Sequence, residues 1–187
     1  PAMTFRSRAW CHNTAGAHTP LFLYASYEAV HGASSCFVLG KPPNCKKPDG
    51  DELQAPPPYI AAQSHIVNGD RRTFAGMLGA LDEGMRNISS VLETRGMWSN
   101  TIVLFSTDNG APNSHFGQST MSNWPLRGGK GQLWEGGIRG TGFMWGKGVP
   151  VGVNITGLIH CTDWLPTLVA VAGGDPAPSD RMLDGFN

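Results

Sequence analysis

The sequence predicts an α/β fold, because segments typical of buried strands alternate with segments typical of helices. Residues 20–27 (PLFLYASY) form a short apolar run without strict alternation, as in a strand buried on both faces of a parallel sheet. Residues 71–95 carry apolar side chains at steps of three and four, which predicts a long amphipathic helix. Residues 101–106 (TIVLFS) are β-branched and apolar and predict a second strand. This order is typical of a sheet with crossover connections.

The long helix has recognisable ends and one apolar face. Asp70 can cap its first turn, and Gly96 follows its last turn as a stop. The apolar stripe consists of Phe74, Met77, Leu78, Leu81, Met85, Ile88 and Leu92.

Three further segments complete the predicted organisation of a single domain over residues 1–187. Residues 142–145 are a third strand candidate, and a second helix is expected from about Trp164 to Ala172. One face of that helix would carry Leu165, Leu168, Val169 and Ala172. Residues 32–58 contain six prolines and few periodic apolar residues, which predicts a long surface loop or insertion.

Composition excludes some classes of function. Lys and Arg number 14, as do Asp and Glu, so the net charge is zero and a dedicated nucleic-acid binder is disfavoured. Apolar runs are all shorter than the roughly 18 residues of a membrane-spanning helix, so no membrane span is expected. The cysteines are Cys11, Cys36, Cys45 and Cys161; Cys36 and Cys45 would make the simplest loop disulfide, and free thiols are the alternative.

Polar residues follow two predicted strands, where open α/β sheets bind ligands. His31 lies four residues past the first strand, and Asp108 and Asn109 directly follow the second. A carboxylate and an amide oxygen are both ligands for calcium or magnesium. The alternative is an ordinary turn, since Asp and Asn before Gly110 are common turn residues, and spacing alone favours the turn.

The segment 123–140 (NWPLRGGKGQLWEGGIRG) is dense in glycine and in charged and aromatic residues. Glycines allow close approach of the backbone to a ligand, and Lys130 could supply positive charge to an anion. The order of residues is not that of a P-loop. The alternative is a glycine-rich loop with solvated basic side chains.

Several motifs occur together and in order. Residues 105–110 (FSTDNG), 123–130 (NWPLRGGK) and 133–140 (LWEGGIRG) are similar to those of the type I sulfatases. Within that family the arylsulfatase B (N-acetylgalactosamine-4-sulfatase) group is the most similar. Supporting stretches are 20–24 with 30–31, 74–77 with 81–83, and His160 with 163–168, and the likeness extends from about Phe5 to Phe186.

The resemblance implies an alkaline-phosphatase-like sandwich with a mostly parallel central sheet, of which this chain would be the later part. It implies that Asp108 and Asn109 ligate calcium. It also implies that Lys130 and His31 bind the sulfate and act in catalysis, with His31 assisting the departing oxygen. Cations and a proton donor of this kind stabilise the charge that develops as a sulfate ester breaks.

The chain also departs from the family pattern. Family members use a nucleophile made by oxidising a cysteine, or in some bacteria a serine, in a Cys/Ser-x-Pro-Ser-Arg motif, and these 187 residues contain no such motif. The nucleophile is therefore expected upstream, and the given polypeptide by itself is expected to be inactive. His31 is followed by Gly32-Ala33 rather than x-Pro, and Gly129 stands where Arg is common.

Two sequons, at Asn87 and Asn154, add a cellular context. With the resemblance they favour a glycoprotein that is lysosomal or secreted. The expected activity is calcium-dependent hydrolysis of a sulfate ester, on a sulfated small molecule such as an aryl sulfate or on a glycosaminoglycan-type glycan. The alternatives are a phosphate-ester hydrolase of the same superfamily and a non-catalytic protein that binds anions or glycans.

Overall fold

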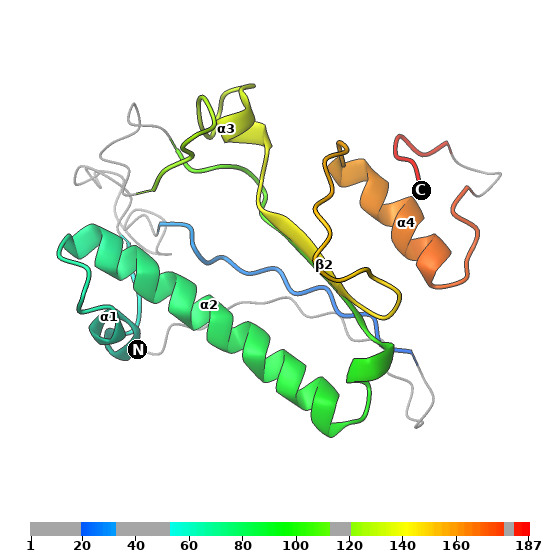
Figure 1. The fold of residues 1–187 in the computed structure, drawn as a ribbon, viewed down its shortest axis with the longest axis horizontal. Helices are drawn as coiled ribbons and strands as arrows, with labels where there is room; N and C mark the ends of the chain where they lie inside the picture. Colours follow the sequence, from blue (N-terminus) through cyan, green and yellow to red (C-terminus); the bar gives the residue numbers. More distant parts are fainter. Residues whose placement is uncertain (1–19, 33–52, 113–120, 178–181) are drawn as a thin grey trace, which may run out of the picture. The chain divides into compact units, whose positions relative to one another are not determined.

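A computed structural model describes residues 20–32, 53–112, 121–177 and 182–187. The chain divides into two compact units, Pro1–Val149 and Pro150–Asn187. In the first unit the elements are α1 (Pro57–Ala62), α2 (Gly69–Thr94), the 3-10 turn η2 (Trp98–Asn100), β1 (Ile102–Ser106), α3 (Glu135–Ile138) and β2 (Gly142–Gly146). The second unit contains the 3-10 turn η4 (Cys161–Asp163) and α4 (Trp164–Val171). Figure 1 shows α2 as the longest element.

The long helix α2 confirms the periodicity that predicted it, within two residues at each end. Its N-cap is Asn68, whose side-chain Oδ1 accepts from the backbone N–H of Arg71 at 2.9 Å. The prediction that Asp70 caps the helix is therefore wrong. Asp70 lies in the first turn, where a negative charge is favourable to the helix dipole, but it stands too late to accept from the free N–H groups.

The stop signal at the other end of α2 is confirmed. Gly96 has a φ of 67°, in the left-handed region that favours glycine. Its N–H donates to the Glu93 carbonyl at 2.9 Å, and the N–H of Met97 donates to the Leu92 carbonyl at 2.8 Å. These two bonds satisfy carbonyls that the helix end would otherwise leave free.

The apolar stripe of α2 forms the centre of the first unit. Met77, Ala80, Leu81 and Leu92 are the buried hydrophobic residues of the described part of the chain. Leu78, which was placed on the stripe, is exposed, because its position lies at the edge of the buried face.

Helix α1 packs against α2 through a glycine. A Cβ atom on Gly76 would lie 3.1 Å from the backbone nitrogen of Ile60, so the close approach of the two helices needs glycine there. The Tyr59 hydroxyl donates to the Glu83 carboxylate across the same interface. Pro57 and Pro58, predicted in the loop over 32–58, instead begin α1, where proline is well tolerated. Residues 33–52 of that loop lie outside the described residues.

The two strands β1 and β2 form an antiparallel pair, with Leu104 opposite Met144 and Phe105 opposite Phe143. The rings of Phe105 and Phe143 stack with centroids 5.0 Å apart, and those of Trp98 and Trp145 with centroids 4.3 Å apart. Both predicted strands over 101–106 and 142–145 are confirmed. Their pairing is antiparallel, and mostly parallel sheets of the kind that the resemblance implies commonly include an antiparallel strand.

Residues 20–27 form no strand, so that prediction is wrong. The segment runs alongside α2 (Figure 1), and a Cβ on Gly84 would lie 3.2 Å from Cε1 of Tyr27. Its side chains alternate between half-buried Leu23, Ala25 and Tyr27 and exposed neighbours such as Phe22. A strand buried on both faces needs a sheet around it, and the sheet of the described residues has two strands, neither of them here.

The second unit confirms the predicted helix as α4. Of the predicted face, Leu168 and Val169 are half-buried, whereas Leu165 and Ala172 are exposed and Pro166 is buried instead, so the prediction is wrong for Leu165 and Ala172. Before the helix, Asp163 accepts from the backbone N–H of His160 at 2.8 Å and from that of Phe186 at 3.0 Å. These hydrogen bonds lower the pKa of Asp163, that from Phe186 more than that from His160.

Two further features of the described residues bear on the expectations from the sequence. None of the helices among them is long and apolar enough to cross a membrane. Cys161 is a free, exposed thiol, while Cys11 and the predicted Cys36–Cys45 pair lie outside the described residues.

Candidate functional site

The candidate metal ligands stand directly after β1. The strand ends at Ser106, and the next backbone N–H, of Thr107, donates to the carbonyl of Thr141 just before β2 at 2.9 Å. The chain then turns, leaving Asp108 exposed and Asn109 half-buried. A regular strand pair therefore holds the backbone up to the residue before Asp108.

The glycine-rich segment is hydrogen-bonded to this turn. The N–H of Gly110 donates to the carbonyl of Gly137 at 3.0 Å, and the N–H of Lys130 donates to the carbonyl of Ala111 at 2.9 Å. Lys130 is thus fixed by its own backbone to a residue two positions after Asn109. The two motifs that were separate in the sequence form one pair of loops.

The side chain of Asn123 joins the two loops. Its Oδ1 accepts from the N–H of Ala111 at 2.8 Å, and its Nδ2 donates to the carbonyls of Ala111 at 2.8 Å and Gly128 at 3.0 Å. In the sequence, Asn123 is only the first residue of the segment 123–140. A single asparagine at the start of a loop gives no sequence signal for such a bridge, because its partners Ala111 and Gly128 lie 12 and five residues away along the chain.

Two glycines allow the loops to approach this closely. A Cβ on Gly110 would overlap the carbonyl oxygen of Gly136, and a Cβ on Gly136 would overlap the carbonyl oxygen of Gly128. The N–H of Gly136 in turn donates to the Arg127 carbonyl at 2.8 Å. The glycine content of 123–140 is therefore needed for backbone packing as well as for any approach of a ligand.

Lys130 and His31 differ in how the structure holds them. Lys130 is half-buried in the loop pair. His31 is exposed, and its ring Nδ1 lies 2.7 Å from the carbonyl of Gly32, which can only accept, so Nδ1 carries the proton. No hydrogen bond among the described residues links His31 to Asp108, Asn109 or Lys130. Backbone hydrogen bonds bring Asp108, Asn109 and Lys130 into one pair of loops, whereas the hydrogen bond of His31 is to Gly32.

The donor set for a metal is incomplete among the described residues. They contain no group of three or more His, Cys, Asp or Glu side chains placed to hold an ion. Asp108 and Asn109 offer a carboxylate and an amide oxygen, which suits a hard cation, whereas calcium takes six to eight oxygens. These two residues fit part of a calcium site, and its other ligands would have to come from water or from residues outside the described part.

The sequon residues are both accessible. Asn87 is exposed on α2 between half-buried Met85 and Ile88, and Asn154 is exposed in a loop.

Comparison with known proteins identifies the family. The chain matches the sulfatase family model over residues 6–174. It is 40% identical to arylsulfatase J of Mus musculus over 171 residues, which cover 90% of this chain and 24% of that protein. It is 27% identical to N-acetylgalactosamine-6-sulfatase of Sus scrofa, covering 91% of this chain and 28% of that protein. The chain therefore belongs to the sulfatase family, which confirms the resemblance to type I sulfatases.

Solved structures agree. The crystal structure of Ps i-CgsB in complex with k-i-k-neocarrahexaose matches with a TM-score of 0.65 and 35% identity, over 72% of this chain and 29% of that one. The PsFucS1 sulfatase from Pseudoalteromonas sp. matches with a TM-score of 0.52 and 30% identity, over 75% of this chain and 26% of that one. The α/β class is thereby confirmed. The chain spans about a quarter of the length of the curated relatives it matches.

Proposed function

We propose that the protein hydrolyses a sulfate ester, transferring the sulfuryl group to water and releasing an alcohol or phenol together with sulfate. The observation that carries the proposal is the loop pair, in which the backbone of Lys130 is bonded to Ala111, beside the turn of Asp108 and Asn109. A turn that offers oxygen ligands, next to a lysine whose backbone is fixed, suits a substrate that is itself an anion and whose departing oxygen gains charge.

In this proposal Asp108 and Asn109 ligate calcium. Their oxygens stand at the carboxyl end of β1, where a strand pair limits movement of the backbone. The bound ion would supply positive charge opposite the sulfate oxygens.

Lys130 and His31 have separate roles in the proposed reaction. The Lys130 ammonium donates hydrogen bonds to sulfate oxygens, since it has no lone pair to offer a metal. His31 donates its Nδ1–H to the Gly32 carbonyl in a hydrogen bond, which leaves Nε2 to exchange a proton with the ester oxygen. No Cys/Ser-x-Pro-Ser-Arg motif stands in the 187 residues, so the role of nucleophile is assigned to none of them.

The proposed substrate class is a sulfated glycan of the glycosaminoglycan type or an aryl sulfate. Support comes from the names of relatives, which include an N-acetylgalactosamine-6-sulfatase and an enzyme crystallised with a neocarrahexaose. The proposed location is lysosomal or secreted, supported by the exposed sequon residues Asn87 and Asn154.

The test uses protein produced from the complete coding sequence, with 4-nitrophenyl sulfate and 4-nitrophenyl phosphate as parallel substrates and calcium present. We expect turnover of the sulfate that falls by about a hundredfold or more in Lys130→Ala. Lys147→Ala is the matched control, because the Lys147 ammonium is bonded to Asn100 instead, at 2.8 Å. Faster turnover of the phosphate would favour the phosphate-ester hydrolase. Binding of sulfate esters without turnover would favour the non-catalytic protein.

A further inference from the structure

Arg127 is a cation that the proposed function does not use. It stands three residues before Lys130 in the same loop, so the two Cα atoms are at most about 11 Å apart. Its guanidinium carbon lies 3.6 Å from the centroid of the Trp134 ring, over the face of that ring. Within the described residues no carboxylate pairs with it, whereas Arg139, farther along the same loop, is paired with Glu135 at 3.5 Å.

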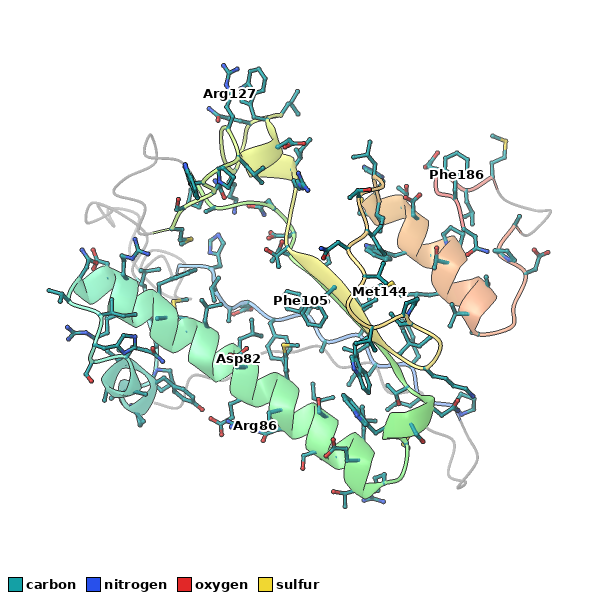
Figure 2. All side chains as sticks on the ribbon, viewed as in Figure 1. Asp82, Arg86, Phe105, Arg127, Met144 and Phe186 are labelled. Carbon is teal, nitrogen blue, oxygen red and sulfur yellow. The ribbon has the colours of Figure 1, made fainter. Side chains whose placement is uncertain are left out.

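The contact with Trp134 leaves the N–H donors of Arg127 available to bind a ligand. A guanidinium that lies over an aromatic face uses its π surface, while its five N–H donors point outward in its own plane. Figure 2 shows the Arg127 side chain at the outer end of the loop, extending away from it. The guanidinium is thus held in one place and remains free to bind an anion in a bidentate manner.

The loop around Arg127 is also unusually apolar on its surface. Trp124 is 86% exposed and Leu133 is 92% exposed, although both side chains are large and hydrophobic. The backbone below them is held by the Asn123 amide bonds to Ala111 and Gly128. Exposed aromatic surface next to unpaired positive charge is typical of a binding surface.

We propose that Arg127, held over Trp134, is a second anion subsite, which binds the sulfate or carboxylate of a sugar neighbouring the one that is hydrolysed. Trp124 offers an apolar face to the same glycan. The proposal rests on the proposed function, because it takes Lys130 as the position of the sulfate that is cleaved. It narrows the substrate class to glycans that carry anionic groups on adjacent sugars.

The test measures how well two tetrasaccharides compete with 4-nitrophenyl sulfate. Both are chondroitin tetrasaccharides whose uronate carboxyl groups have been reduced to alcohols, one with a single terminal sulfate and the other with a second sulfate on the neighbouring sugar. For the wild-type protein we expect the inhibition constant of the disulfated compound to be about tenfold lower, the effect of one charge-assisted bidentate contact at an exposed site. In Arg127→Ala the ratio of the two inhibition constants falls to about one, while the KM and kcat for 4-nitrophenyl sulfate change less than about twofold.

Three other variants separate this role of Arg127 from a general effect on glycan binding. Arg95→Ala removes an exposed arginine at the end of α2 and leaves the ratio unchanged. Trp134→Tyr keeps an aromatic face under Arg127 and retains most of the ratio, whereas Trp134→Leu loses part of it. Melting temperatures of all variants are measured to establish that they are folded.

Two results overturn the inference: an unchanged ratio in Arg127→Ala, or an equal loss for the tetrasaccharides and for 4-nitrophenyl sulfate. If the wild-type protein hydrolyses neither 4-nitrophenyl sulfate nor the tetrasaccharides, the proposed function has failed. The same ratio is then measured as dissociation constants by calorimetry, so the subsite is tested in either case.

Discussion

Asn123 shows how much of the candidate site depends on one side chain. A primary amide can accept at one atom and donate at another, and Asn123 does both, to Ala111 and Gly128. Neither a carboxylate nor an alkyl group can replace it. The position of Lys130 relative to Asp108 therefore depends on the chemistry of a residue that makes no contact with substrate in the proposed reaction.

We expect Asn123→Asp to destabilise the protein by about 1–3 kcal/mol, because two carbonyl groups lose their donor and face a negative oxygen instead. Urea unfolding followed by tryptophan fluorescence measures the change. Asn100→Asp is the matched control, since Asn100 only accepts, from the Lys147 ammonium, and an aspartate still accepts. Equal losses in the two variants would contradict the bridging role of Asn123.

The proposed roles in metal binding and in sulfate binding belong to different residues, Asp108 and Lys130. In the protein from the complete coding sequence, we expect Asp108→Ala to lose calcium binding and activity together. Lys130→Ala should lose activity but bind calcium, because an ammonium group cannot ligate a cation. Calcium titration by calorimetry and turnover of 4-nitrophenyl sulfate are the two measurements.

Asp82→Ala, which removes an exposed carboxylate on α2, is the control for Asp108 and should leave both readings unchanged. If Asp108→Ala bound calcium as tightly as the wild type, Asp108 would be an ordinary turn residue.

At the scale of elements, the position of Asn87 on α2 bears on modification. The helix turns Asn87 to solvent while Met85 and Ile88 are half-buried. In protein secreted from a eukaryotic cell we expect a glycan at Asn87, detected as a mass shift of its peptide that glycosidase treatment removes. Ser89→Thr keeps the sequon and the glycan, whereas Ser89→Ala loses it. An unmodified Asn87 together with a modified Asn154 would count against this accessibility.

The turn before α4 has a predictable dependence on pH. Asp163 accepts backbone hydrogen bonds from Phe186 and His160, which lower its pKa below the ordinary value. A carboxylate with a lowered pKa adds stability that is present above the pKa of the unfolded state, about 4, and is lost as the pH falls through the folded-state pKa. We expect the N–H of Phe186 to be protected from hydrogen exchange at pH 6. Below pH 4 we expect it to lose more protection than the pH dependence of the intrinsic exchange rate accounts for.

Asp163→Asn is the comparison for that measurement, because an amide cannot titrate in this range. Its protection should be weaker than that of the wild type at pH 6, and the two should converge at low pH. A constant difference between them at all pH values would exclude ionisation of Asp163 as the cause.

At the scale of the whole molecule, the described residues have a small core. The four buried hydrophobic residues all lie on α2, while large side chains such as Phe22, Tyr24 and Phe186 are exposed. The match to the sulfatase family model, over residues 6–174, includes parts of both compact units. The chain covers about a quarter of its curated relatives, so it holds only part of the residues on which a sulfatase domain of their size is built.

We expect the 187-residue polypeptide, produced by itself, to show no turnover of 4-nitrophenyl sulfate above background in the presence of calcium. Groups that stabilise charge cannot replace a covalent nucleophile, and none of the 187 residues stands in the nucleophile motif. The protein from the complete coding sequence is the positive control. Turnover by the polypeptide that disappeared in Lys130→Ala would show that it carries a nucleophile of its own.

The local elements and the family relationship follow from the order of amino acids alone. Apolar spacing is a property of neighbouring residues, and it placed α2, β1, β2 and α4 within a few residues of their observed bounds. Sequence motifs likewise identified the sulfatase relationship, because Asp108, Asn109 and Lys130 stand in ordered, specific segments.

How these elements pack against one another depends on contacts between residues far apart along the chain. The antiparallel register of β1 and β2, the unpaired course of residues 20–27 and the Asn68 cap depend on which backbone groups find partners. The bridge from Asn123 and the stacking of Arg127 on Trp134 join residues whose identities allow many other contacts. Hydrogen bonds and ring contacts depend on distances in space, and residue spacing along a chain with glycine-rich loops leaves those distances open.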